Sequence, residues 1–218
     1  NADDLELLPG RQLHLRGAAE LESQCSESCD SGGGVGPGCV EAAGDGHGVL
    51  GCICKMTMEE KLKIQYGDYE AVLYPEAGGA LVTLRKGDVQ VFWPCKNAQE
   101  AMEAPTRHGL PCLFPPNRID AGHFVFDGRE YQFPMKPNKA NNFSHGFLHI
   151  RPWKTEKLTE NTAVLQYNCD ETTDFYPAYP HRFRMEVRYT LTEAGLQQEA
   201  QVTNFGTTAM PVGLGWHT

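Results

Sequence analysis

Two histidines stand in stretches where side chains could carry out proton transfer. The stretch NNFSHGFLHIRPW places His145 beside Gly146, and PVGLGWHT brings His217 out at the end of a small, apolar run. Histidine has an ordinary pKa of ~6.5, so it can donate and recover a proton near neutral pH. The structural alternative for His145 is a core histidine that is hydrogen-bonded to a strand carbonyl.

A third stretch, GLPCLFPPNRIDAGHF, places Asn117 and Arg118 directly after two prolines. The prolines favour a rigid, extended approach. On such a loop the planar fork of arginine donors can be aimed at a ligand oxygen. From the residues alone, ligand binding and hydrogen bonding to the loop's own carbonyls remain equally open roles for Arg118.

The spacing of histidines and cysteines does not predict a metal site. His145 and His149 are four residues apart, but they lie in an irregular segment, where that spacing has no geometric meaning. The five cysteines before residue 55 lack the paired C-x2-C spacing of a structural zinc site. We expect Cys95, Cys112 and Cys169 to be small core residues, and we expect neither a metal nor a cofactor.

The elements that must position these residues are short β-strands. In RFRMEVRYTL, apolar and polar residues alternate over ten positions, which predicts a strand with one buried face. HFVFDGREYQF predicts two strands joined by a tight turn at Asp127 and Gly128. Only NAQEAME is typical of a short helix. The pattern predicts an all-β fold, an antiparallel β-sandwich or barrel.

Composition divides the 218 residues into two parts. Residues 1–54 hold nine acidic and two basic residues, with eleven glycines and five cysteines, which predicts a disordered acidic tail. Residues 55–218 are nearly neutral and form the predicted folded domain. We expect no nucleic-acid partner, because no basic surface is indicated, and no membrane partner, because no long apolar run is present. A cytoplasmic location is the default, and the oligomeric state is open.

In order and spacing, the three stretches resemble the aldose 1-epimerase (mutarotase) family. The resemblance rests on LFPPNRI, GHFVFDGREYQFP, HGFL with PW, and YPHRFRMEVRYTL followed by VTNFGTTAMPVGLGWHT. It covers residues 56–218 and leaves residues 1–54 out. It implies a galactose mutarotase-like two-sheet supersandwich, truncated at the C-terminus, and a small-molecule partner, a free aldohexose whose α and β anomers are interconverted without a cofactor.

The resemblance also implies roles for individual residues. His217 matches the family's general acid, which protonates the ring oxygen, and His145 matches the second histidine. Arg118, with Asn117 beside it, matches the sugar-binding arginine. The family's general base is a glutamate that is expected beyond Thr218, and Asp174 is a minor alternative. The competing interpretation is a non-catalytic carbohydrate-binding module on the same fold.

Overall fold

A computed structural model describes residues 5–19, 61–135 and 141–217 of the chain. No helix in these described ranges is long and apolar enough to cross a membrane. The elements, in chain order, are β1 (Leu5–Leu7), β2 (Gln12–Ala19), β3 (Leu62–Tyr66), β4 (Tyr69–Tyr74), β5 (Ala80–Lys86), β6 (Val89–Gln90), α1 (Ala98–Glu103), β7 (Cys112–Leu113), β8 (Arg118–Asp120), β9 (His123–Phe126), β10 (Arg129–Gln132), β11 (Asn142–Ser144), a 3₁₀ turn (Leu148–Ile150), β12 (Lys154–Leu158), β13 (Thr162–Cys169), β14 (Phe183–Thr192), β15 (Gly195–Asn204), β16 (Met210–Val212) and β17 (Gly215–Trp216).

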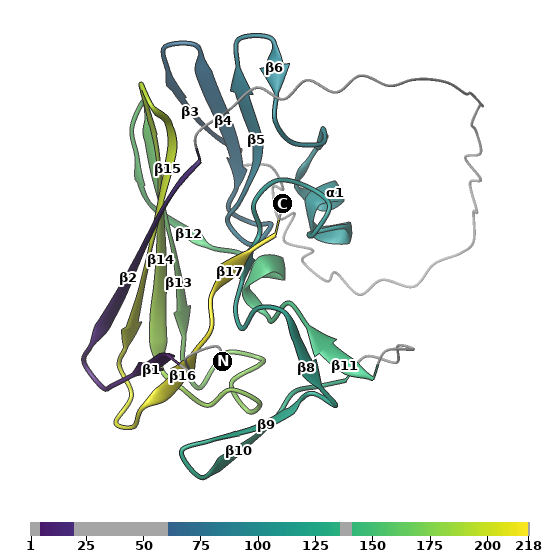
Figure 1. The fold of residues 1–218 in the computed structure, drawn as a ribbon, viewed down its shortest axis with the longest axis vertical. Coiled ribbons are helices and arrows are strands. Elements are labelled where there is room, and N and C mark those ends of the chain that lie inside the picture. Colours follow the sequence, from purple (N-terminus) through teal and green to yellow (C-terminus); the bar gives the residue numbers. More distant parts are fainter. Residues whose placement is uncertain (1–4, 20–60, 136–140, 218) are drawn as a thin grey trace, which may run out of the picture. The chain divides into compact units, whose positions relative to one another are not determined.

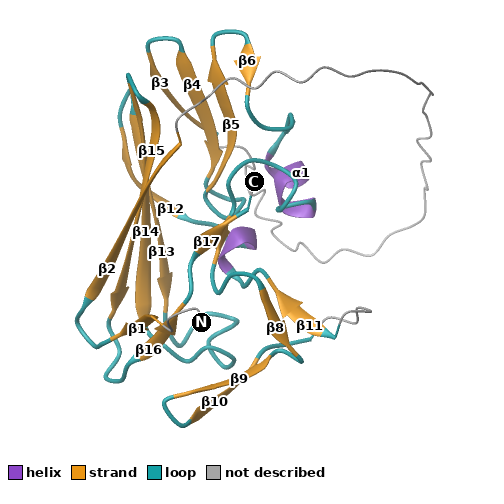
Figure 2. Ribbon diagram, viewed as in Figure 1, coloured by secondary structure: helices purple, strands orange, loops and turns teal. Residues whose placement is uncertain are grey.

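Two antiparallel sheets dominate the described part of the chain (Figure 1). The larger has the strand order β12-β13-β14-β15-β2, and the smaller has the order β3-β4-β5-β6. The remaining strands form short two-stranded ribbons, among them β7 with β17 and β8 with β11. Figure 2 shows that strands make up most of the regular structure, as the sequence predicted.

Strand β14 shows why the larger sheet forms. Its residues alternate between buried and more exposed positions along its whole length. It pairs with β15 in an unbroken antiparallel register that runs from Phe183 opposite Asn204 to Thr192 opposite Gly195. One face of the hairpin therefore carries the apolar side chains into the core, and the other stays polar.

A shared hydrophobic core joins the two sheets. Ile64 of β3 and Leu73 of β4 belong to the same buried cluster as Leu165 of β13 and Val187 of β14. The predicted turn at Asp127 and Gly128 is present, with positive φ at both residues. The predicted short helix is α1, which Asn97 caps by accepting a hydrogen bond from the Glu100 backbone N–H.

The prediction of a disordered tail over residues 1–54 is wrong for residues 5–19. Here β2 pairs antiparallel with β15 and β1 pairs with β16. The pairing is favourable because it satisfies the backbone groups along the edge of β15, and Leu13 packs against the core. The rest of the predicted tail, and its boundary at residue 54, lie outside the described residues.

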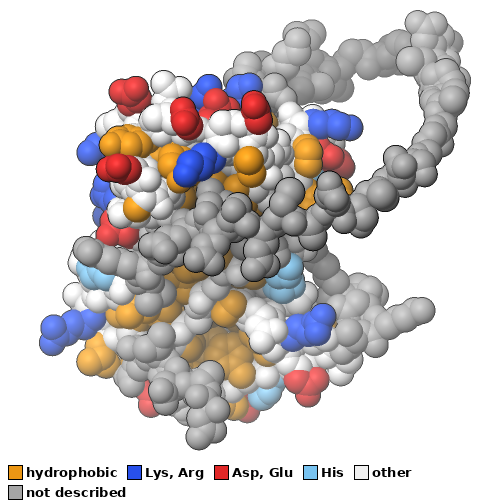
Figure 3. Space-filling view, turned by 45° about the horizontal axis from the view of Figure 1, so that its top comes forward, with side chains coloured by type: hydrophobic (Ala, Val, Ile, Leu, Met, Phe, Trp, Pro, Cys, Tyr) orange, Lys and Arg blue, Asp and Glu red, His pale blue; other side chains and the backbone are white. Residues whose placement is uncertain are grey.

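Charges of both signs are mixed on the hairpin ends of the smaller sheet, which face the viewer in Figure 3. Lys63 of β3 and Glu70 of β4 form an ion pair there, with 2.6 Å between nitrogen and oxygen. The Lys86 ammonium lies 4.9 Å from the centre of the Tyr69 ring. This exposed end of the sheet therefore carries paired charges, without a field of one sign.

Candidate active site

The loop of residues 114–117 brings the candidate residues together, because it lies between two short strands that pair with distant parts of the chain. β7 pairs with β17, with Cys112 opposite Trp216, and β8 pairs with β11, with Arg118 opposite Ser144. His217 directly follows β17, and His145 directly follows β11. Both histidines therefore lie beside the same loop.

His145 is held by the backbone on both sides. Its N–H donates to Asn117 O at 2.9 Å, and its φ of 65° places it in the left-handed region, which is rare for a residue with a side chain. At Gly146 a Cβ atom would lie 2.0 Å from Phe114 O, so only glycine permits this close approach. The Phe147 N–H then donates to Phe114 O. The backbone at His145 is therefore held next to the loop.

His217 reaches the site by a second close approach. A Cβ atom at Gly213 would lie 2.8 Å from Cδ of Pro116. A Cβ atom at Gly215 would lie 3.1 Å from Cβ of the same proline. The two glycines thus let the strand pass the proline. The exposed His217 ring then meets the His145 ring edge to face, with 5.5 Å between centroids and 88° between planes.

The surroundings of His145 favour the neutral imidazole. Burial lowers its pKa from the ordinary 6.5, and the positive charges of His217 and Arg118 lower it further. Its Nδ1 atom is buried and has no hydrogen-bond partner in the described part of the chain. The alternative of a core histidine tied to a strand carbonyl through Nδ1 is therefore not what the structure shows.

A cavity of about 920 Å³ opens beside His145. Aromatic rings supply much of its wall, among them Phe143, Phe147 and Phe175. Arg151 and Asp174 stand at the wall as an ion pair, in which Nε and Nη2 of the arginine donate to the two carboxylate oxygens at 3.1 and 2.6 Å. The lining is therefore mostly apolar with a few polar groups, as is usual for a small-molecule site.

The structure places the predicted binding residues at the surface next to this histidine pair. Asn117 and Arg118 are both exposed, and Asn117 has a left-handed φ of 62°. The structure gives the Arg118 side chain no hydrogen bond to any described residue, so it does not tie down the loop's carbonyls. Asp174, the minor candidate for the base, is engaged with Arg151.

Two other residues of the stretches quoted above, Trp153 and His149, are buried. Trp153 is buried, and its indole N–H donates to Leu148 O. His149 is buried and lines the cavity. Sequence reasoning missed Arg151, whose guanidinium lies 5.6 Å from the centre of the Phe175 ring. No spacing in the sequence marks it, because its partners are 23 and 24 residues away.

Comparison with known proteins identifies the family of the chain. The family model described as aldose 1-epimerase matches residues 60–218, most of the chain. The uncharacterized protein YihR of Escherichia coli K12 is 31% identical over 163 residues, which cover 72% of this chain and 49% of YihR. The chain spans about half the length of the curated relatives it matches.

Solved structures show the same fold. A galactose mutarotase-like protein from Clostridium acetobutylicum has a TM-score of 0.65 and 31% identity over 71% of this chain and 48% of that protein. Another from Lactobacillus casei has a TM-score of 0.57 and 18% identity over 72% and 48%, a likeness of fold alone. With the family model, the sandwich and the resemblance in sequence in agreement, the chain belongs to the aldose 1-epimerase family.

Proposed function

We propose that the protein is an aldose 1-epimerase that interconverts the α and β anomers of a free aldohexose. The observation that carries this proposal is the edge-to-face contact of His145 and His217 at 5.5 Å, beside the exposed Asn117 and Arg118. Two imidazole rings thus stand next to a guanidinium that is free to bind hydroxyl oxygens.

The reaction needs an acid and a base, and no electrons leave the sugar. A base removes the proton from the C1 hydroxyl while His217 protonates the ring oxygen, and the ring opens to the aldehyde. Rotation about C1–C2 and closure on the other face give the second anomer. His145, kept neutral by its surroundings, holds the ring or its hydroxyls, and Arg118 donates to them.

The base is assigned to a glutamate beyond Thr218, at the place where the family carries it. Among the described residues, the carboxylates that line the cavity are Glu103 and Asp174. Glu103 accepts a hydrogen bond from the Gln99 amide at 2.9 Å, and Asp174 is paired with Arg151. Both carboxylates are therefore already engaged by neighbouring side chains.

Polarimetry tests the assignment. The protein, extended to its natural C-terminus where the natural chain continues past Thr218, is added to freshly dissolved α-glucose or α-galactose. We expect rotation to change faster than the spontaneous drift, and we expect His217→Gln to slow the catalysed rate by ~10²–10⁴-fold. His123→Gln, at an exposed histidine on β9, is the matched control and should leave the rate unchanged. A rate that His217→Gln leaves intact would overturn the role of His217.

A carbohydrate-binding module without catalysis is the second candidate. The ion pair of Asp174 with Arg151 favours this second candidate. Asp174 lies between β13 and β14 and lines the cavity, but its carboxylate is already bound to the arginine. Binding of glucose or galactose by calorimetry, with no acceleration of mutarotation by the naturally complete protein, would establish this alternative.

The setting of this activity is proposed to be the cytoplasm, where free sugars are metabolised. In the part of the chain that the structure describes, Cys95, Cys112 and Cys169 are free thiols, which suits a reducing compartment. Burial raises the pKa of Cys112 to about 12, so this thiol stays protonated and inert. The proposal includes no nucleic-acid and no membrane partner.

A further inference from the structure

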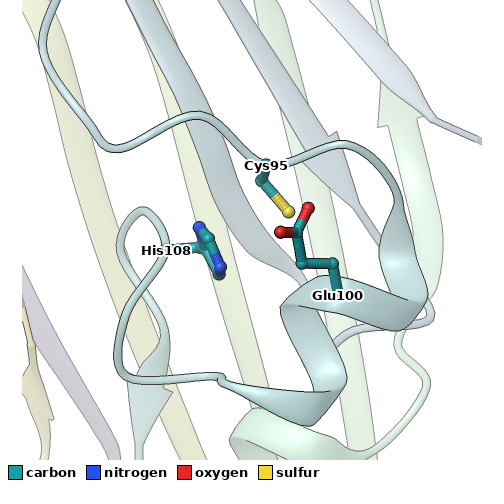
Figure 4. Close-up of side chains that lie close together, drawn as sticks. All are labelled: Cys95, Glu100 and His108. Atoms are coloured by element: carbon teal, nitrogen blue, oxygen red, sulfur yellow. The ribbon is translucent and has the colours of Figure 1, made fainter. Parts of the chain in front are cut away.

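Three side chains with metal-binding chemistry meet around helix α1, away from the histidine pair. Cys95 precedes the helix, Glu100 lies on it and His108 follows it, and Figure 4 shows the three side chains turned toward one another. One donor atom from each lies within 4.8 Å of the other two. The spacing C-x4-E-x7-H matches no common zinc motif, so the sequence did not indicate this cluster.

Backbone hydrogen bonds fix two of the three side chains. The Cys95 thiol donates to Asn97 O at 3.3 Å, and Glu100 Oε2 accepts from the Lys96 N–H at 2.7 Å. The Glu100 N–H in turn donates to the Asn97 side chain at 2.9 Å. These bonds are those of a helix N-terminus, and they leave the carboxylate with capacity for a further partner, because each of its oxygens can accept more than one bond.

The third side chain, His108, lacks a hydrogen-bond partner for one ring nitrogen among the described residues. Only 6% of its surface is exposed, and its Nδ1 is buried without a hydrogen-bond partner in the described ranges. Its position is set by its neighbours: a Cβ atom at Gly109 would lie 2.0 Å from Leu81 O, and the Leu110 N–H donates to that same oxygen. A buried unsatisfied nitrogen costs stability, so it points to a partner that the chain itself does not supply.

We propose that Cys95, Glu100 and His108 form a binding site for Zn²⁺. Thiolate, imidazole and carboxylate are the three ligand types that zinc takes in proteins, and the soft sulfur disfavours magnesium and calcium. Bonds of ~2.0–2.3 Å in a tetrahedron put ligand atoms about 3.3–3.8 Å apart, so the cluster closes by about 1 Å on binding. The fourth position is left to water or to a group from another molecule.

Zinc here would act on the wall of the cavity beside His145. The helix end and the loop after it, through Met102, Glu103 and Thr106, line that cavity. A metal held by Cys95 before α1, Glu100 on it and His108 after it would keep this wall in one position.

A competition titration against a chromophoric zinc chelator tests the site. The background is the full 218-residue chain in which serine replaces the five cysteines outside the described residues, at positions 25, 29, 39, 52 and 54, because they could bind zinc by themselves. We expect one zinc per chain. Cys95→Ser and His108→Gln should each weaken binding at least tenfold, since loss of a ligand costs no less than loss of a second-shell partner.

Matched substitutions separate the site from general effects. Glu100→Gln keeps an oxygen for the Lys96 N–H but removes the anionic ligand, so zinc binding should weaken. Glu103→Gln, an exposed acid on the same helix, should leave it unchanged. His123→Gln is the equivalent control for His108→Gln. Circular dichroism of every variant confirms that the strands are retained.

A second measurement needs no substitution at the site. Zinc should slow alkylation of Cys95 in the background chain, as followed by mass spectrometry of the modified peptides. Zinc affinity that neither Cys95→Ser nor His108→Gln changes, or alkylation of Cys95 at the same rate with and without zinc, would overturn the proposal. Neither result depends on sugar turnover, so the test is independent of the proposed epimerase activity.

Discussion

His145 combines three unfavourable features at one position. Its φ is 65°, its Nδ1 is buried without a partner among the described residues, and its charged form is disfavoured by burial and by His217 and Arg118. Residues held in sparsely populated conformations cost about 1–3 kcal/mol and gather at functional sites. Asn117, on the facing loop, is also left-handed. The unusual conformation and the unpartnered buried nitrogen of His145 are typical of a functional site.

His181 shows the contrasting case of a buried histidine with a structural role. Its Nε2 shares a hydrogen bond of 2.7 Å with the Tyr131 hydroxyl, and only 3% of its surface is exposed. Burial, and next the positive charge of Arg129, lower its pKa to about 4. The folded protein therefore keeps His181 neutral at every pH at which the histidine pair could work.

This lowered pKa predicts a loss of stability in mild acid. Between pH ~6.5 and about 4 the unfolded chain binds a proton at His181 that the folded chain does not, so stability falls as the pH falls through this window. The contribution of His181 should lower the free energy of unfolding by about 2 kcal/mol from pH 7 to pH 5. Urea denaturation at the two pH values measures it.

The control is His181→Gln, which keeps a group able to bond the Tyr131 hydroxyl but does not titrate. Its loss of stability between pH 7 and pH 5 should be smaller than that of the wild-type chain by about the same 2 kcal/mol. Equal losses in the two proteins would show that His181 is not the group responsible.

At the scale of elements, the site depends on backbones that approach closely. The loop of residues 114–117 is contacted from one side by Gly146 and from the other by Gly213 and Gly215. A Cβ atom would lie 2.0 Å from the nearest atom at Gly146 and 2.8 Å at Gly213, and 3.1 Å at Gly215, so the first two approaches leave no room for a side chain and the third is tight. The strands β7, β8, β11 and β17 are only two or three residues long, and these contacts complement their few ladder bonds.

Gly146→Ala should therefore be strongly destabilising. The new Cβ needs a left-handed backbone and meets Phe114 O at 2.0 Å, so the free energy of unfolding should fall by more than about 3 kcal/mol. Gly128→Ala is the matched control, since it has a similar φ of 71° and no atom within 4 Å of the new Cβ. It should cost ~1–2 kcal/mol. Equal costs would mean that the close approach is not what requires glycine at 146.

At the scale of the whole described fold, the two ends of the chain are joined. The N-terminal strands β1 and β2 pair with β16 and β15, close to the point where the chain turns toward His217. The buried Asn204 secures this junction: its Nδ2 donates to Leu7 O and to Thr208 O, each at 2.9 Å, and its Oδ1 accepts from the Gly206 N–H. A single side chain thus ties the N-terminal strands to the turn before β16.

Replacing Asn204 by alanine tests this junction. Three hydrogen bonds are lost at a fully buried position, which should reduce the free energy of unfolding on the order of 3 kcal/mol. Asn168→Ala provides the comparison, because Asn168 is exposed and bonds only the Arg184 side chain, so its effect should stay within about 0.5 kcal/mol. Chemical denaturation measures both, and similar values would contradict a special role for Asn204.

The sequence by itself determined the local elements. Alternation alone predicted β14, the Asp127–Gly128 pair predicted the hairpin of β9 and β10, and the stretch NAQEAME predicted α1, because period, turn chemistry and local composition are properties of neighbouring residues. It also identified the class of fold. It failed for residues 5–19, whose strands form by pairing with β15 and β16, nearly 200 residues away.

Only the tertiary structure decided which side chains meet. His145 and His217 were each singled out in sequence, but their contact depends on two strand pairs around one proline loop. No spacing marks Arg151 and Asp174, which are 23 residues apart in the chain. None marks Cys95, Glu100 and His108 either, because their proximity depends on the path of the chain on both sides of α1. Contacts between residues distant in the chain follow from packing, which local patterns do not encode.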